Sequence, residues 1–243
     1  MAVTIYRQDN QPVFVLHTYP FKETSLVVEL FSREFGRVAA VAKGARRPRS
    51  AMRGMLQAFQ PLQATWSGKA ELKNLHSMEW GSGLLLLRGE ALMCGFYLNE
   101  LLLRLLPRED GHDALFDYYG QTLRILAQEQ VPPATTLRRF ELKLLQELGY
   151  AVPLQHDAEG NDVQIGQVYS YAVEHGAMRA SGHVPQANSV QLTGKTLLDM
   201  AQDHYSDPLT QQQSKQLMRL LLAHYLNDKP LHTRQLLMDL QAL

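Results

Sequence analysis

The chain has 243 residues, of which 45% are hydrophobic and 20% charged, a composition that supports a packed core and excludes an intrinsically disordered protein. At about 150 residues per domain, this length predicts one large or two small domains. The 24 basic and 24 acidic residues balance, but residues 1–80 hold 11 basic and 6 acidic residues, leaving 13 basic and 18 acidic in residues 81–243. This asymmetry suggests an anionic partner for the N-terminal part.

The single cysteine excludes several classes of protein. Cys94 cannot form an intramolecular disulfide or a multi-cysteine zinc or iron–sulfur site, and its apolar helical surroundings predict a buried, inert thiol. The N-terminal residues lack the apolar segment of a signal peptide, and charged residues interrupt the longest apolar stretch, residues 84–106. We therefore expect a reduced, soluble protein of the cytoplasm.

The first 80 residues contain five short segments typical of β-strands, separated by turn residues. Five strands at this spacing favour a small barrel of the OB type. In the last segment the alternation of apolar and polar residues slips at Lys73-Asn74, which predicts a β-bulge there. The predicted strands cover residues 13–16, 26–31, 38–41, 62–66 and 72–78.

After Gly81-Ser82-Gly83 the apolar period changes from 2 to about 3.6, which indicates helices. We predict one that ends at Pro107 and others over residues 112–130, 135–148, 210–227 and 231–241. Residues 151–192 are β-like and form an insert. The predicted fold class is α+β, with an N-terminal OB-type β-barrel in residues 1–80 and an α-helical domain with a small β insert in residues 81–243.

The most distinctive local feature is a run of basic residues after the third predicted strand. Between Phe35 and Ala70 there are seven basic residues and no acidic one, and Gly44 and Pro48 indicate a loop. Such a loop repels itself, and a polyphosphate backbone relieves the repulsion. The candidate DNA-binding residues are Arg37, Lys43, Arg46, Arg47, Arg49 and Arg53. Candidate stacking aromatics are Phe31, Phe35, Phe59 and Trp66, whose orientation the pattern does not fix. The alternative is a solvated basic loop without a ligand.

Motifs of enzymes and metal sites are incomplete. Thr193-Gly194-Lys195-Thr196 resembles the end of a phosphate-binding loop, but Ser189 stands where its first glycine belongs, so Thr193 is better explained as a helix cap. The Glu141-x-Lys143 pair of some nucleases falls in a predicted helix rather than a strand. The histidines and acids of the insert have no compact ligand spacing; these are His156, Asp157, Asp162, His175 and His183. We predict no enzyme, no metal and no cofactor.

Several blocks of sequence resemble, in order, the RecO family of bacterial recombination mediators. They are VLHTYPFKETS at 15–25, LFSREFGRVAAVAKGARRPRS at 30–50, FYLNELLLRLL at 96–106, TLRRFELKLLQELGY at 136–150 and KPLHTRQLL at 229–237. The resemblance covers nearly the whole chain and is weakest across residues 151–195.

This resemblance implies an OB-fold followed by a helical domain, and a non-enzymatic role in DNA repair at the nucleoid. Members of the family bind single- and double-stranded DNA, anneal complementary strands and, with RecR, help RecA load on DNA coated by the single-strand-binding protein SSB. Many members carry a four-cysteine zinc site in the insert. This chain has no cysteine there, so we expect the insert to fold without zinc.

The resemblance also implies a docking site for the acidic tail of SSB. Arg138 and Arg139 lie near the start of the predicted helix 135–148, beside Leu137, Phe140 and Leu144, and at least one of the two should point away from the core. The ordinary alternative is that they pair with Glu141, Glu147 or other surface acids. A different function also stays open: a structural adaptor whose basic loop binds an acidic protein rather than DNA. A nuclease is a third possibility.

Overall fold

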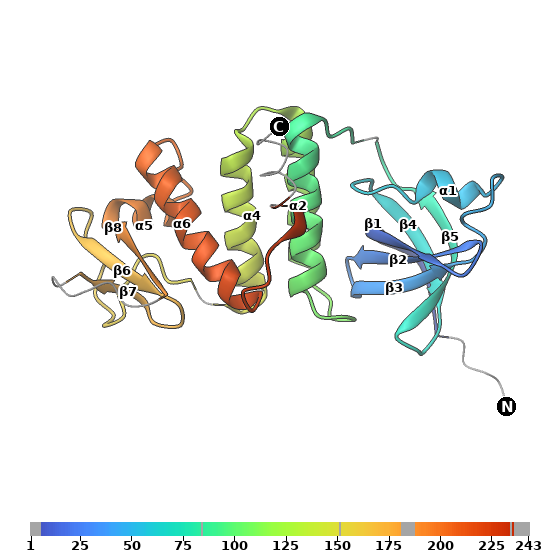
Figure 1. The fold of residues 1–243 in the computed structure, drawn as a ribbon, viewed down its shortest axis with the longest axis horizontal. Helices are drawn as coiled ribbons and strands as arrows, with labels where there is room; N and C mark the ends of the chain where they lie inside the picture. Colours follow the sequence, from blue (N-terminus) through green and yellow to red (C-terminus); the bar gives the residue numbers. More distant parts are fainter. Residues whose placement is uncertain (1–5, 84, 151, 181–187, 234, 236–243) are drawn as a thin grey trace. The chain divides into compact units, whose positions relative to one another are not determined.

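The computed structural model describes residues 6–83, 85–150, 152–180, 188–233 and 235. These residues form two compact units (Figure 1). The first contains the described residues up to Gln130 together with residues 232, 233 and 235, and the second contains those between Val131 and Leu231. Each unit is described separately. No helix in the described part of the chain has the length and apolarity needed to cross a membrane.

The first unit begins with a closed five-stranded barrel, as predicted. In spatial order the strands are β1-β2-β3-β5-β4, with β3 and β5 parallel and the other neighbours antiparallel. The strands are β1 (Arg7–Phe21), β2 (Ser25–Ser32), β3 (Gly36–Ala42), β4 (Leu62–Ser67) and β5 (Leu72–Trp80). Every second side chain points inward. The barrel core contains Val13, Val15, Val28, Leu30, Val38, Ala40, Ala42, Ala45, Leu62, Ala64, Trp66, Leu75 and Met78.

Strand direction gives the barrel two different ends. Because β1, β3 and β5 run the same way, their last residues lie at one end, together with the first residues of β2 and β4. We call this the loop end. It carries the β1–β2 turn, the β3–β4 connection over residues 43–61 and the chain that follows β5. Within that connection, α1 (Ala51–Met55) packs Met52 and Met55 against the barrel core. The opposite end, the turn end, carries the β2–β3 and β4–β5 turns.

The bulge in β5 lies at a different residue from the one predicted. Lys73 and Asn74 pair in regular register with Ala40 and Val41, and the shift occurs where Trp66 pairs with Leu75, which leaves His76 unpaired. The prediction placed the bulge at Lys73-Asn74 because two polar residues in a row interrupt the alternation there. Lys73 is in fact buried, because its ammonium group lies 2.5 Å from the Glu109 carboxylate.

Two helices, α2 (Gly89–Leu105) and α3 (Asp113–Gln128), pack on the outer face of the barrel. The Phe14 and Phe31 rings contact the Phe116 ring at centroid distances of 5.1 and 5.3 Å. Asn99 donates a hydrogen bond of 2.9 Å to the Leu16 carbonyl and accepts one of 2.5 Å from Tyr119. The last strand of the barrel ends at Trp80, whereas the first compact unit continues through these helices to Gln130.

The turn end is joined to the α2–α3 connection by close backbone contacts. Gly36 has φ +59°, and a Cβ atom there would lie 1.7 Å from the Asp110 carbonyl oxygen. A Cβ atom on Gly111 would similarly lie 2.3 Å from the Glu34 carbonyl oxygen. Both positions require glycine because no side-chain atom fits between the two segments.

Arg108 and Glu100 add ionic links to this unit. The Arg108 guanidinium lies 2.7 Å from Glu29 in β2 and 2.9 Å from Glu71. The Glu100 carboxylate in α2 accepts hydrogen bonds of 2.8 Å from the backbone N–H groups of His232 and Thr233. Glu100 therefore holds residues far along the chain in the first unit. Most of the predicted helix 231–241 lies outside the described residues, of which 232, 233 and 235 are helical.

The second unit combines helices with a small sheet, as predicted for the β insert. Its elements are α4 (Pro133–Glu147), β6 (Val168–Ala172), β7 (Gly176–Arg179), β8 (Ser189–Thr193), α5 (Gly194–Ala201) and α6 (Pro208–Tyr225). The sheet has the order β7-β6-β8 and buries Tyr169 and Tyr171. Thr193 caps α5, because its hydroxyl accepts a hydrogen bond from the Thr196 N–H. This contact confirms the interpretation of that segment as a helix start.

Candidate nucleic-acid interface

The basic loop, defined here as residues 43–53, lies at the loop end of the barrel. Its side chains Lys43, Arg46, Arg47, Arg49 and Arg53 are all exposed. The backbone is nevertheless fixed: Ala45 is fully buried in the barrel core, and the Arg46 N–H donates a hydrogen bond of 2.9 Å to the Thr24 carbonyl. Gly44 supplies the left-handed conformation of the turn, with φ +69°. The loop therefore presents its cations from a well-anchored backbone.

The five cations of the basic loop carry no internal counter-charge. Among the described residues, none of them forms an ion pair, whereas Arg33, Arg104 and Arg108 each have a carboxylate partner. Lys22 is a sixth exposed cation. It lies next to the basic loop, since the Arg46 guanidinium donates a hydrogen bond of 3.5 Å to the Lys22 carbonyl. The sequence did not reveal Lys22, since it lies in the β1–β2 turn, 21 positions before Lys43. This cationic surface is suited to an anionic ligand.

Arg37 lies elsewhere. It is near the start of β3, and six residues of extended strand separate it from Lys43, a distance of roughly 20 Å. Its guanidinium is half-buried and donates a hydrogen bond of 2.6 Å to the Leu103 carbonyl. Burial, followed by the charge of Arg108, lowers the pKa of Arg37. The structure therefore does not bring Arg37 together with the other candidate residues.

The aromatic side chains proposed for stacking are not available to a ligand. Phe31, Phe59 and Trp66 are buried, and Phe35 is half-buried with its ring 5.6 Å from that of Trp66. An exposed aromatic that the sequence analysis missed is Trp80, the last residue of β5, which is 49% exposed at the loop end. In a sequence, an apolar residue at the end of a predicted strand is usually assigned to the core. Only the barrel geometry shows that the Trp80 side chain is exposed to solvent.

The outer face of β2 and β3, where OB barrels commonly bind nucleic acid, is covered. Its residues Glu29, Phe31, Ala39 and Val41 are all buried. Phe31 packs against Phe116 of α3, and Glu29 pairs with Arg108. Because α3 and the α2–α3 connection contact this face, we place the candidate interface at the loop end.

Arg138 and Arg139, the predicted partner-binding residues, have carboxylate partners in the second unit. Arg138 donates a hydrogen bond of 2.5 Å to the fully buried Glu141, and Arg139 donates one of 2.7 Å to Asp203. The ordinary alternative is confirmed for Glu141, while Glu147 pairs with Lys143 at 2.6 Å instead. Of the two arginines, Arg139 is the more accessible, because its side chain is 28% exposed and that of its partner 63%.

The incomplete enzyme and metal motifs have structural explanations. Lys195 lies 2.5 Å from Asp199 and 2.9 Å from Asp207, so its ammonium group is neutralised within the unit. In the described part of the chain, no three histidine, cysteine or acidic side chains are grouped so as to hold a metal ion. Asp157 instead accepts hydrogen bonds from the N–H groups of Glu159 and Asn161. His183 lies outside the described residues.

Comparison with known proteins agrees with this architecture. Residues 7–83 match the family model "Recombination protein O N terminal", and residues 86–235 match "Recombination protein O C terminal". Proteins named DNA repair protein RecO are similar over nearly the full length. The one from Nitrosospira multiformis is 54% identical over all of both chains, and the one from Dechloromonas aromatica is 52% identical over 97% of each. The one from Ralstonia nicotianae is 51% identical over 98% of this chain and 87% of its own.

Proposed function

The chain belongs to the RecO family of DNA repair and recombination proteins, and from this premise we propose that it is a non-enzymatic, DNA-binding recombination mediator. It binds single- and double-stranded DNA and anneals complementary strands. Together with RecR it helps RecA load on DNA coated by SSB. The observation that carries the DNA-binding part of the proposal is the cluster of exposed, internally unpaired cations in the basic loop.

The chemistry of the basic loop fits a sequence-independent DNA contact. Lysine and arginine side chains that neutralise phosphates release condensed counterions, and phosphates are common to single and double strands. Covering two backbones with cations lowers their mutual repulsion, so complementary strands approach closely enough to pair. Annealing of this kind needs no covalent chemistry.

For the SSB tail, we propose Arg139 as the primary contact, with Arg138 as a supporting residue. An incoming carboxylate can replace the exposed Asp203 at Arg139. Replacement of Glu141 at Arg138 is much costlier, since it would leave a buried carboxylate without its cation. The expected result is that Arg139→Ala weakens binding of an acidic tail peptide more than Arg138→Ala does. Equal affinity of both variants and the unchanged protein would exclude this site.

The alternative function is a structural adaptor whose basic loop binds an acidic protein. The two functions differ in the ligand that is bound and in how the affinity for DNA depends on salt concentration. Phosphate contacts predict binding to any single strand, with log K falling linearly with log salt concentration at about 0.7 per contact. An adaptor would show no such binding to DNA.

The test of the DNA-binding surface is the combined Arg46→Ala, Arg47→Ala and Arg49→Ala variant. Loss of three phosphate contacts should flatten the salt slope by roughly 2 and slow the annealing of complementary oligonucleotides, with and without SSB. The barrel should stay folded, because Ala45 and Met52 rather than these exposed side chains fix the loop. An unchanged slope at unchanged affinity would remove the basic loop from the DNA surface.

A further inference from the structure

Trp80 is an exposed aromatic side chain on the cationic end of the barrel. Its Cα atom pairs with that of Leu62 at the start of β4, which places it at the loop end with residues 43–53. About half of its surface is exposed. None of the ring–ring and cation–π contacts among the described residues involves its indole. An exposed tryptophan beside a cationic loop is the combination found in sites that bind single-stranded nucleic acid.

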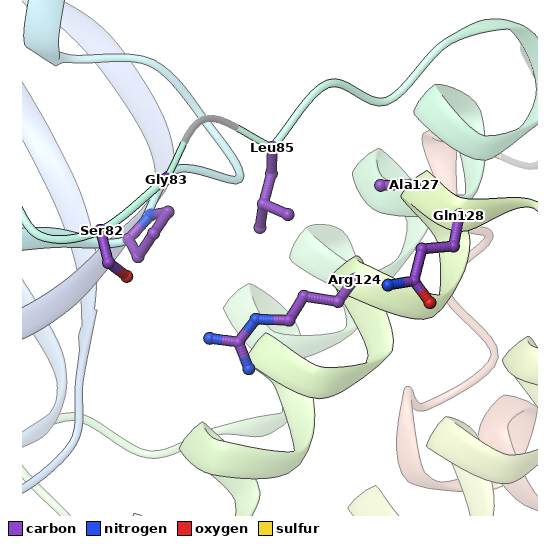
Figure 2. Close-up of a pocket in the computed structure, with 7 residues that line it drawn as sticks. Ser82, Gly83, Leu85, Arg124, Ala127 and Gln128 are labelled. Carbon is purple, nitrogen blue, oxygen red and sulfur yellow. The ribbon is translucent and has the colours of Figure 1, made fainter.

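The chain that follows Trp80 lines a hollow with a second free cation. This hollow has a volume of about 340 Å³ and apolar walls formed in part by Pro61, Leu85 and Ala127. Figure 2 shows the Arg124 guanidinium reaching from α3 toward the linker that carries Ser82. Arg124 is exposed and forms no ion pair with any residue that the structure describes.

We infer that Trp80 and Arg124 form a subsite for single-stranded DNA, in which an unpaired base stacks on the indole and a neighbouring phosphate binds the guanidinium. The inference rests on the proposed DNA-binding function and adds a preference to it. Only Gly81 lies between Trp80 and Ser82, so their Cα atoms are at most about 7 Å apart. Because Ser82 lines the same hollow as Arg124, one strand reaches both side chains.

This subsite discriminates between kinds of DNA, which the basic loop alone does not. The loop contacts phosphates, and these are present in both single strands and duplexes. A base inside a duplex is already stacked and paired, and its extrusion costs several kcal/mol. Only a single strand therefore offers a base to Trp80. Tyr19 is also exposed near the loop end, but its ring already lies 4.5 Å from that of His17.

The test compares three ligands of equal length with the full chain: an oligothymidylate, a duplex, and a strand of abasic phosphodiesters. Trp80→Leu should weaken oligothymidylate binding by about five- to 150-fold, the range that corresponds to loss of one stacked base. Binding of the duplex and of the abasic strand should change less than twofold. Trp80→Phe, which keeps a stacking surface, should restore most of the affinity. Arg124→Gln should flatten the salt slope by about 0.7 for the single strand.

A matched control is Tyr6→Leu, because Tyr6 is equally exposed but lies at the turn end of the barrel, before β1. It should leave all three affinities unchanged. Fluorescence gives a second measurement: the chain has two tryptophans, and Trp66 is buried in the core, so quenching by oligothymidylate reports on Trp80.

Equal oligothymidylate affinity of Trp80→Leu and the unchanged protein would overturn the inference. An equal loss for the abasic strand would do so as well, because it would show that no base is stacked. Neither result would contradict DNA binding by the basic loop, which the triple arginine variant tests separately. If that variant also bound every ligand normally, the proposed function itself would fail.

Discussion

Replacing Glu100 by glutamine is expected to release the segment around His232 and Thr233 from the first unit. Both carboxylate oxygens of Glu100 are engaged: Oε1 accepts from the His232 N–H and lies 2.7 Å from Arg104, and Oε2 accepts from the Thr233 N–H and hydroxyl. A glutamine amide has one acceptor oxygen, and its NH₂ group would face backbone N–H donors. The Glu100→Gln variant therefore loses the contacts of at least one of the two carboxylate oxygens.

The magnitude follows from burial. The Glu100 side chain is only 10% exposed, so breaking its contacts leaves polar groups without water. Loss of one partner of a buried charged pair costs about 3–5 kcal/mol, which for a chain of this size lowers the melting temperature by roughly 6–20 °C. Thermal unfolding measures the shift. Limited proteolysis measures the release of the segment, which should be cut near Thr233 in the variant.

Glu90→Gln is the matched control, because Glu90 lies in the same helix, α2, and is exposed. It should change the melting temperature by less than about 2 °C. If the Glu100→Gln and Glu90→Gln variants had the same melting temperature and the same proteolytic pattern, Glu100 would not hold the segment around Thr233 in place.

The pH dependence of stability gives an independent check on Glu100. Burial raises the pKa of its carboxyl group, but hydrogen bonds from Thr233 and His232 and the charge of Arg104 outweigh burial, and the net pKa lies below its ordinary value. A carboxyl group whose pKa is lower in the folded state stabilises the fold above its unfolded pKa, near 4.5. This contribution is lost as the pH falls through the folded pKa. The gap in stability between the unchanged protein and Glu100→Gln should therefore shrink in acid.

Three further outcomes are expected. Arg37→Gln should leave the salt slope of DNA binding unchanged, unlike the triple arginine variant, because Arg37 binds the Leu103 carbonyl at the other end of the barrel. Gly36→Ala should lower the melting temperature in a thermal scan, since its Cβ atom would meet the Asp110 carbonyl oxygen; Gly54→Ala, with open space, is the control. A metal chelator should change neither thermal stability nor DNA binding, and stoichiometric zinc in the purified protein would contradict this.

The barrel could be predicted because its signal is local. Alternation of apolar and polar residues, with turn residues between the strands, predicts all five strands, and β2 to β5 begin and end within two residues of the prediction. The first strand was predicted too short, because β1 covers Arg7–Phe21 rather than residues 13–16. The bulge was misplaced because a sequence pattern treats Lys73 as polar, whereas the fold pairs it with Glu109 and buries it. That contact joins residues 36 positions apart in the chain.

The candidate site was only partly predictable for the same reason. The basic loop is contiguous in sequence, so its cations were found together. Arg37 was included because it is close in sequence, although an extended strand carries it to the opposite end of the barrel. Lys22, Trp80 and Arg124 were missed because they come from three separate segments that only the closed barrel and α3 bring to the loop end. Glu100 and Thr233 likewise meet only in three dimensions.

The covered outer face of β2 and β3 bears on the proposed annealing of complementary strands. A single strand bound along such a face turns its bases toward the protein, where stacking on aromatic side chains protects them from pairing. In this chain Phe31 and Glu29 are buried by the helical part of the unit, so the face is closed to DNA. A strand held at the loop end by its phosphates keeps most of its bases exposed to solvent. We therefore expect the bound strand to remain open to its complement, which is the condition that annealing requires.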